Sequence, residues 1–189
     1  MAYIGDISRE DAALLTTTAR SARRILEFGV GASTQVMAQA APASADIVSL
    51  ETDPVWIART RRNFSLLGIE RPVTFLPYDG WQSHVSGEFD VVFDDGVDAL
   101  RLPFALAAWS LLGVGGVMLF HDTRRPGDMR NVLDLVGSAF LSVESVSCNA
   151  EHSNITVVRK KAAEPYVDWN VVEHRSRWQV GQEEAPDDF

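Results

Sequence analysis

Five acidic residues stand at the ends of apolar runs that predict buried β-strands. The runs cover residues 24–28, 47–50, 72–76, 89–93 and 116–120. The acids at or just beyond their ends are Glu27, Glu51, Asp79, Asp94 and Asp122. Carboxylates accept forked hydrogen bonds from paired hydroxyls, and they bind ammonium groups and metal ions. Five carboxylates at one edge of a sheet are difficult to explain by solvation of the surface alone.

The elements that carry these acids alternate regularly between strand and helix. This alternation predicts an α/β fold, Rossmann-like and doubly wound, with helices on both faces of a mostly parallel seven-stranded sheet. Residues 141–146 and 154–158 predict a closing antiparallel hairpin at the C-terminal end. Ligands of such sheets bind at the carboxyl ends of the strands, near the point where the strand order reverses. The five acids are therefore expected to meet at a binding edge.

A glycine turn follows the first predicted strand. Gly29 and Gly31 leave room for a sharp turn and for the close approach of a ligand, and Ser33 and Thr34 open the next helix. The free N–H groups of that helix point into the same space. Glu51, with Thr52 beside it, comes about twenty residues later, which is the spacing expected for a ribose-binding acid. A ligand of the nucleoside type is therefore predicted.

The type of nucleoside depends on Glu27 and Thr34. A dinucleotide fingerprint needs a third glycine where Thr34 stands, and Glu27 would repel a pyrophosphate but could bind an ammonium group through water. The pattern Glu27-Phe28-Gly29-Val30-Gly31, followed by Glu51, resembles the class I S-adenosylmethionine-dependent methyltransferases. The resemblance covers roughly residues 24–160 and implies S-adenosylmethionine as the cofactor.

The resemblance also implies where the adenine lies. In that family the end of the third strand runs along the ring, so Asp79 is expected to accept from the exocyclic amine and Trp81 to stack, with Gly80 between them. The alternative is a capped turn with Trp81 in the core. Asp94 is expected to line the same cofactor pocket.

A metal site is a second implication of resemblance. The segments Phe93-Asp94-Asp95-Gly96 and Phe120-His121-Asp122-Thr123 look like those of the cation-dependent O-methyltransferases of the catechol and macrolide-sugar types. The likeness implies Mg²⁺ bound by Asp94, Asp122 and Thr123, although catechol-type enzymes usually have asparagine where Thr123 stands. Asp94 and Asp95 should point to opposite faces. The alternative is that Asp94 only lines the cofactor pocket and Asp122 caps the next segment.

His121 and Asp122 are the predicted catalytic residues. Imidazole titrates near neutrality, so His121 could act as the general base for a hydroxyl acceptor, or it could point into the sheet. The predicted function is methyl transfer from S-adenosylmethionine to a small-molecule hydroxyl. The alternatives are an NAD(P)-dependent oxidoreductase and a non-catalytic binding protein of the same fold.

Composition narrows the class of protein. The chain has 189 residues and a net charge of −9, which disfavours nucleic-acid partners. A single cysteine, Cys148, and no secretion signal predict a reducing, cytoplasmic setting. The uncharged stretch 102–120 contains Pro103 and several glycines, so a helix followed by a strand is expected there and no membrane span.

The predicted domain covers residues 1–161, with an N-terminal helix within 1–23 and the core in 24–160. Residues 162–189 are predicted to form a polar tail that contains Tyr166, Trp169 and Trp178, and its last residues are expected to be disordered. The sequence does not determine the oligomeric state, and a homodimer is compatible with it.

Overall fold

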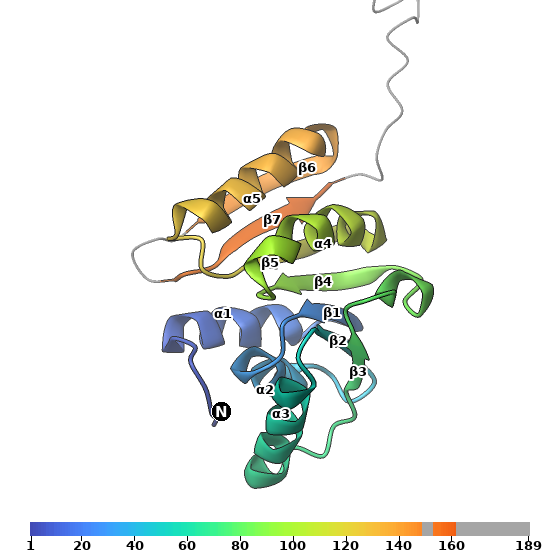
Figure 1. Ribbon diagram of the computed structural model, residues 1–189. Coiled ribbons are helices and arrows are strands. Elements are labelled where there is room, and N and C mark those ends of the chain that lie inside the picture. The colour runs from blue at the N-terminus through green and yellow to red at the C-terminus, as the bar shows by residue number, and fades with distance from the viewer. Residues whose placement is uncertain (149–152, 162–189) are drawn as a thin grey trace, which may run out of the picture.

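A computed structural model describes residues 1–148 and 153–161, and it shows one sheet between two layers of helices (Figure 1). The sheet has seven strands in the order β3-β2-β1-β4-β5-β7-β6. The strands are β1 (Arg24–Phe28), β2 (Asp46–Glu51), β3 (Thr74–Pro77), β4 (Phe89–Asp94), β5 (Leu112–Phe120), β6 (Val143–Cys148) and β7 (Thr156–Lys160). Strands β1 to β5 are parallel, whereas β7 is antiparallel to β5 and β6. The predicted fold class is confirmed.

The helices divide between the two faces of the sheet. They are α1 (Arg9–Ala19), α2 (Ala32–Ala40), α3 (Pro54–Leu67), α4 (Asp98–Leu111) and α5 (Pro126–Ser138), with short 3₁₀ turns at Trp81–Ser83 and Phe140–Ser142. One apolar core joins α1, α2 and α3 to the sheet, and a second joins α4 and α5 to the other face. The central strands are therefore buried on both sides, which explains their continuous apolar runs.

Helix boundaries follow local chemistry. Ser8 caps α1 by accepting a hydrogen bond from the Asp11 amide, and Asp53 caps α3 in the same way before Pro54. Gly68 ends α3 in the left-handed conformation, with φ of 65°. These three signals are present in the sequence. The first helix ends at Ala19, within the range 1–23 that was predicted for it.

The uncharged stretch 102–120 is divided between α4 and β5, as expected. Strand β5 begins at Leu112, so residues 113–116 belong to the strand and not to a preceding turn. Within the described residues, no helix combines the length and the apolar character that a membrane span needs. The predicted tail, residues 162–189, lies outside the described residues.

The order of the strands reverses between β1 and β4. The chain builds β1, β2 and β3 outward in one direction and then returns to place β4 beside β1. The loops after β1 and β4 are therefore neighbours, and the Asp95 amide donates to the Phe28 carbonyl at 2.8 Å. This is the crevice in which sheets of this kind bind ligands.

Candidate active site

The glycine turn after β1 fits closely against the loop after β4. Gly29 has φ of 87°, and a Cβ atom there would lie 2.3 Å from the Asp95 carbonyl oxygen. Both the conformation and the contact require glycine. Gly31 is different, because a Cβ there would have no neighbour within 4 Å. Its missing side chain leaves open space on the cavity side of the turn.

Thr34 stands where a dinucleotide fingerprint has its third glycine, and its side chain has a structural role that glycine could not fill. Its hydroxyl accepts a hydrogen bond from the Gly31 amide at 2.9 Å and so caps the first turn of α2. The side chain is fully buried. It therefore fills the space next to the strand that a close helix contact would otherwise use.

Glu27 lies beneath the turn and is fully buried. Its two carboxylate oxygens accept hydrogen bonds from the hydroxyls of Ser33 and Ser49, both at 2.6 Å. Burial raises the pKa of Glu27 to about 7, although the serine hydroxyls partly oppose this shift. Glu27 does not line the cavity itself, but Ser33 does. Its influence on a ligand would therefore pass through Ser33.

Glu51 is fixed at the end of β2 by neutral donors. Its Oε1 accepts from the amides of Thr52 and Asp53 at 2.7 and 3.0 Å and from the Thr52 hydroxyl at 3.1 Å. Its Oε2 accepts from the Val30 amide at 3.2 Å. A carboxylate oxygen can accept more than one hydrogen bond, so Oε2 keeps capacity for a ligand hydroxyl.

A cavity of about 470 Å³ lies beside this turn, within the range of roughly 300–1,000 Å³ that ligand pockets usually occupy. We name it the glycine-loop cavity. It is lined by Asp6, Ile7, Gly29, Val30, Gly31, Ala32, Ser33, Glu51, Thr52, Asp53, Trp56, Asp95, Gly96 and Val97. The structure thus brings together five of the predicted cofactor residues, Gly29, Gly31, Ser33, Glu51 and Thr52.

The residues after β3 lie elsewhere. Asp79, Gly80 and Trp81 are not among the described residues that line the glycine-loop cavity. Trp81 is 1% exposed and packs against Phe104 with ring centroids 5.6 Å apart, so the core alternative describes it correctly. Trp56, from α3, is the aromatic residue at this cavity. The sequence did not indicate that Trp56 lines a cavity, because exposed aromatic residues are common on helices.

Asp94 is the main correction to the predicted site. It pairs in register with Phe28 and Phe120, and its side chain is fully buried on their face of the sheet. Neither carboxylate oxygen has a hydrogen-bond partner among the described residues. Burial raises the pKa of Asp94 well above its usual value, while the charge of Arg101 opposes this. Asp94 therefore lines neither cavity and is not placed to bind a metal with Asp122.

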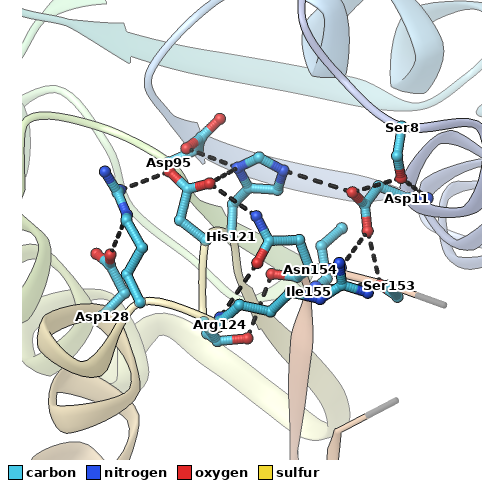
Figure 2. A network of polar contacts seen from close by, with 12 residues as sticks. Ser8, Asp11, Asp95, His121, Arg124, Asp128, Ser153, Asn154 and Ile155 are labelled. Atoms are coloured by element: carbon cyan, nitrogen blue, oxygen red, sulfur yellow. Dashed lines mark hydrogen bonds and ion pairs between the residues drawn. The ribbon is translucent and has the colours of Figure 1, made fainter. Parts of the chain in front are cut away.

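A second cavity, of about 490 Å³, lies next to the first and shares Asp6 and Ile7 with it. We name it the histidine cavity, because His121 and Asp122 line it together with Ser8, Glu10, Asp11, Arg124 and Asn154. Figure 2 shows His121 between Asp95 and Asp11. Its Nδ1 lies 3.1 Å from Asp95 Oδ1, and its Nε2 lies 3.7 Å from Asp11 Oδ2. His121 therefore faces the cavity.

Two pKa shifts mark this cluster. Burial alone would lower the pKa of His121, but the hydrogen bond with Asp95 and the charges of Asp95, Asp122 and Asp11 raise it above 6.5. Burial alone would raise the pKa of Asp11, but hydrogen bonds from Ser153, Ser8 and the Asn154 amide lower it. Perturbed groups in a cavity are candidates for acid–base chemistry.

Asp122 and Thr123 have separate surroundings. Asp122 has φ of 61°, a left-handed turn that aspartate tolerates, and its Oδ1 accepts from the Asn154 amide group at 2.8 Å. The Thr123 hydroxyl donates to the Asn154 carbonyl at 3.2 Å and accepts from Thr156 at 2.9 Å. Thr123 is thus used in packing β7, and the predicted ligand set of Asp94, Asp122 and Thr123 does not form.

Another set of groups stands near the predicted metal position. Single ligand atoms of Asp95, His121 and Asp122 lie within 4.8 Å of one another. A basic side chain, Arg101 from α4, contacts both carboxylates in the same place. Asp95 was missed because β4 is apolar on both faces, so alternation could not say which of two adjacent acids faces the cavity. The sequence did not indicate a role for Arg101 at the site, since the residues around it are those of an ordinary helix.

Comparison with protein-family models and with curated proteins finds no match to the sequence. Solved structures do match. The O-methyltransferase TomG of Streptomyces achromogenes, involved in tomaymycin synthesis and determined with S-adenosylmethionine, is 18% identical, with a TM-score of 0.66 over 83% of this chain and 82% of that one.

The methyltransferase PaMTH1 of Podospora anserina, bound to S-adenosylhomocysteine, is 22% identical, with a TM-score of 0.65 over 83% and 80%. An O-methyltransferase of Bacillus cereus, also with S-adenosylhomocysteine, is 18% identical, with a TM-score of 0.65 over 82% and 83%. At these identities the likeness concerns the backbone. The chain shares its Rossmann-like fold with these solved methyltransferases.

Proposed function

We propose that this protein is an S-adenosylmethionine-dependent methyltransferase that acts on a hydroxyl oxygen of a small molecule. The observation that carries the proposal is the pair of adjoining cavities at the carboxyl edge of the sheet. One has the glycine turn and Glu51, and the other has His121. A reaction between a nucleoside cofactor and a second substrate needs two such spaces with a common boundary.

The glycine-loop cavity suits the cofactor. Glu51 Oε2 can accept from the ribose hydroxyls, and the open side of Gly31 lets the cofactor approach the backbone. The fold likeness to structures that contain S-adenosylmethionine or S-adenosylhomocysteine supports this assignment. The cofactor carries no phosphate, which agrees with Thr34 in place of the third glycine.

The histidine cavity suits the acceptor. In methyl transfer the acceptor oxygen forms a bond to the methyl carbon as the carbon–sulfur bond breaks, and the electron pair stays on sulfur. The hydroxyl proton must leave, and neutral His121 is placed to take it. Asp95 and Asp122 contact Nδ1, which fixes the ring and increases the basicity of the other nitrogen. The acidic net charge of the chain favours a small molecule over nucleic acid.

Calorimetry tests the cofactor assignment. The native protein is expected to bind S-adenosylhomocysteine, and Glu51→Ala should weaken binding by about 10- to 100-fold, because a hydrogen bond to a charged group contributes about 1.5–3 kcal/mol. Glu70→Ala, at an exposed acid outside both cavities, is the matched control. Binding of NADPH without binding of S-adenosylhomocysteine would replace the proposal with an oxidoreductase. Binding of neither would favour a non-catalytic protein.

A further inference from the structure

The guanidinium of Arg101 lies at the junction of three elements. Its Nη2 donates to Asp95 Oδ1 at 3.0 Å and to Asp122 Oδ2 at 3.5 Å. Its Nη1 donates to Asp128 Oδ1 at 3.0 Å and to the His121 carbonyl at 3.1 Å, and its Nε donates to the Gly96 carbonyl at 2.8 Å. A guanidinium has five N–H donors, and all five are used here.

The same carboxylates are those that a divalent ion would need. Asp95 and Asp122 follow β4 and β5, and with His121 they offer the ligand atoms that cluster within 4.8 Å. The place between the two carboxylates is already taken, because Arg101 Nη2 contacts both. The His121 Nδ1 atom lies on the other side, 3.1 Å from Asp95 Oδ1 and 3.4 Å from Asp122 Oδ1.

Both carboxylate oxygens of Asp122 accept hydrogen bonds. Oδ1 accepts from the Asn154 amide group, and Oδ2 accepts from both Arg101 and Arg125. Arg101 is only 5% exposed, so its charge is poorly screened by water. A divalent ion bound beside it would be strongly repelled, unless the arginine moved away and left Asp128 without that contact.

Thr123 provides an independent observation. It follows Asp122 directly and is the third metal ligand that the resemblance implied. Its hydroxyl is directed to Thr156 and to the Asn154 carbonyl, and the side chain is buried. The third ligand position is therefore missing as well. The engaged hydroxyl of Thr123 and the internal cation Arg101 therefore both disfavour a metal ion at this site.

We propose that Arg101 is the resident cation of this edge, and that it joins the ends of β4 and β5 to α5 in place of a divalent metal ion. Arg101 is a positioning residue, because none of its donors remains for a substrate. It orients Asp95 and Asp122, and these carboxylates in turn orient His121.

This assignment deepens the proposed function and rests on it for one consequence. A metal ion selects acceptors that can chelate it through two neighbouring oxygens. A site held together by Arg101 has no such requirement, so an acceptor with a single hydroxyl is sufficient. Methyl transfer should also be insensitive to chelators.

Manganese binding tests the inference without any methyl acceptor. Electron paramagnetic resonance of free Mn²⁺ is recorded as the purified full-length protein is added. The native protein is expected to show no saturable binding at Mn²⁺ concentrations below roughly 1 mM. One Mn²⁺ bound more tightly than this, and lost in Asp95→Asn, would overturn the proposal. This measurement is decisive even if Arg101 variants fail to fold.

Arg101→Met removes the internal charge and keeps much of the side-chain volume. If it folds, it should bind Mn²⁺ with a Kd of about 0.1 mM or less, roughly tenfold below the limit set for the native protein, since Asp95 and Asp122 are then left without that cation. Arg101→Lys keeps the charge and should show no gain, and adding Asp95→Asn to Arg101→Met should remove the gain. A folded Arg101→Met protein that binds no Mn²⁺ would contradict the assignment. S-adenosylhomocysteine calorimetry on the native protein, run in parallel, reports separately on the proposed function.

Discussion

The two cavities at the sheet edge use acidic side chains in different ways. In the glycine-loop cavity Glu51 is held by neutral donors, namely backbone amides and the Thr52 hydroxyl. Around Nδ1 of His121, by contrast, Asp122 and Asp95, the second of which also lines the glycine-loop cavity, are held by the cations Arg101 and Arg125. An acid with neutral donors keeps its full charge available to a ligand, whereas the charge of an acid paired with a guanidinium is compensated in part.

The difference assigns different tasks to the two regions. The neutral shell around Glu51 leaves a negative oxygen at a cavity that would receive a cationic cofactor. The charged shell around Asp95 and Asp122 makes a rigid frame in which His121 is the titrating group. A buried ion pair is weak evidence for stability, so an orienting role for these pairs is consistent with their burial.

The largest expected effect concerns His121. Replacing it with glutamine should lower kcat for methyl transfer by about 10²- to 10⁴-fold, which is the usual contribution of a general base. In the native protein, activity should be lost as the pH falls through the pKa of His121, which lies above 6.5, because only the neutral imidazole accepts a proton. The rate is measured with a hydroxyl acceptor identified by thermal-shift screening.

His84→Gln is the control for His121→Gln, since His84 is exposed. An unchanged rate and pH profile in His121→Gln would show that the histidine cavity does not perform the proton transfer.

The next effect separates the two glycines of the turn. Gly29→Ala should reduce the free energy of unfolding by about 3 kcal/mol or more, because the added Cβ meets the Asp95 carbonyl at a positive φ. Gly31→Ala should leave stability nearly unchanged, since its Cβ has no protein neighbour within 4 Å, but should weaken binding of S-adenosylhomocysteine. Denaturant unfolding and calorimetry distinguish the two results. Equal stability losses would contradict the described turn.

Glu27→Gln should alter how stability depends on pH. The folded-state pKa of about 7 is above the ordinary 4.5, so the contribution of Glu27 is fully present below about pH 4.5 and is lost as the pH rises toward 7. The shift corresponds to about 3 kcal/mol at most. Glutamine cannot ionise, so the free energy of unfolding of the variant should not show this decrease as the pH rises. Urea unfolding at about pH 5 and about pH 8 measures it, and identical pH slopes in both proteins would exclude the effect.

The smallest expected effect is at Trp56. Its indole lines the glycine-loop cavity but is 44% exposed. Trp56→Ala should weaken S-adenosylhomocysteine binding only about 2- to 10-fold, as expected for an aromatic contact of about 0.5–1.5 kcal/mol. Trp81→Ala should instead destabilise the fold, because Trp81 is a core residue. A large affinity loss in Trp56→Ala would mean that this ring is a principal anchor of the cofactor.

The fold and the glycine-loop cavity were predictable because their determinants are local. Gly29, Gly31 and Glu51 follow predicted strands directly, and the parallel arrangement brings strand ends together. Thr34 indicated which class of cofactor to expect, through the absence of a glycine. Each of these inferences needs only the order of the elements and the chemistry of a few neighbouring residues.

The other half could not be predicted in the same way. The choice between Asp94 and Asp95 depends on the orientation of a strand that is apolar on both faces, and a shift of one residue exchanges the faces. The contacts of Arg101 join residues that are 5 to 27 positions apart along the chain. Trp81 occupies the core because Phe104 packs against it, which the sequence around either residue does not reveal.

The contact between Asp11 and Ser153 spans 142 residues. Asp11 receives hydrogen bonds from Ser153 and from the Asn154 amide, so helix α1 is joined to the segment that leads into β7. During synthesis, α1 leaves the ribosome long before that segment does. This side of the histidine cavity can therefore form only after residues 153 and 154 have been translated. Its formation is a late step of folding.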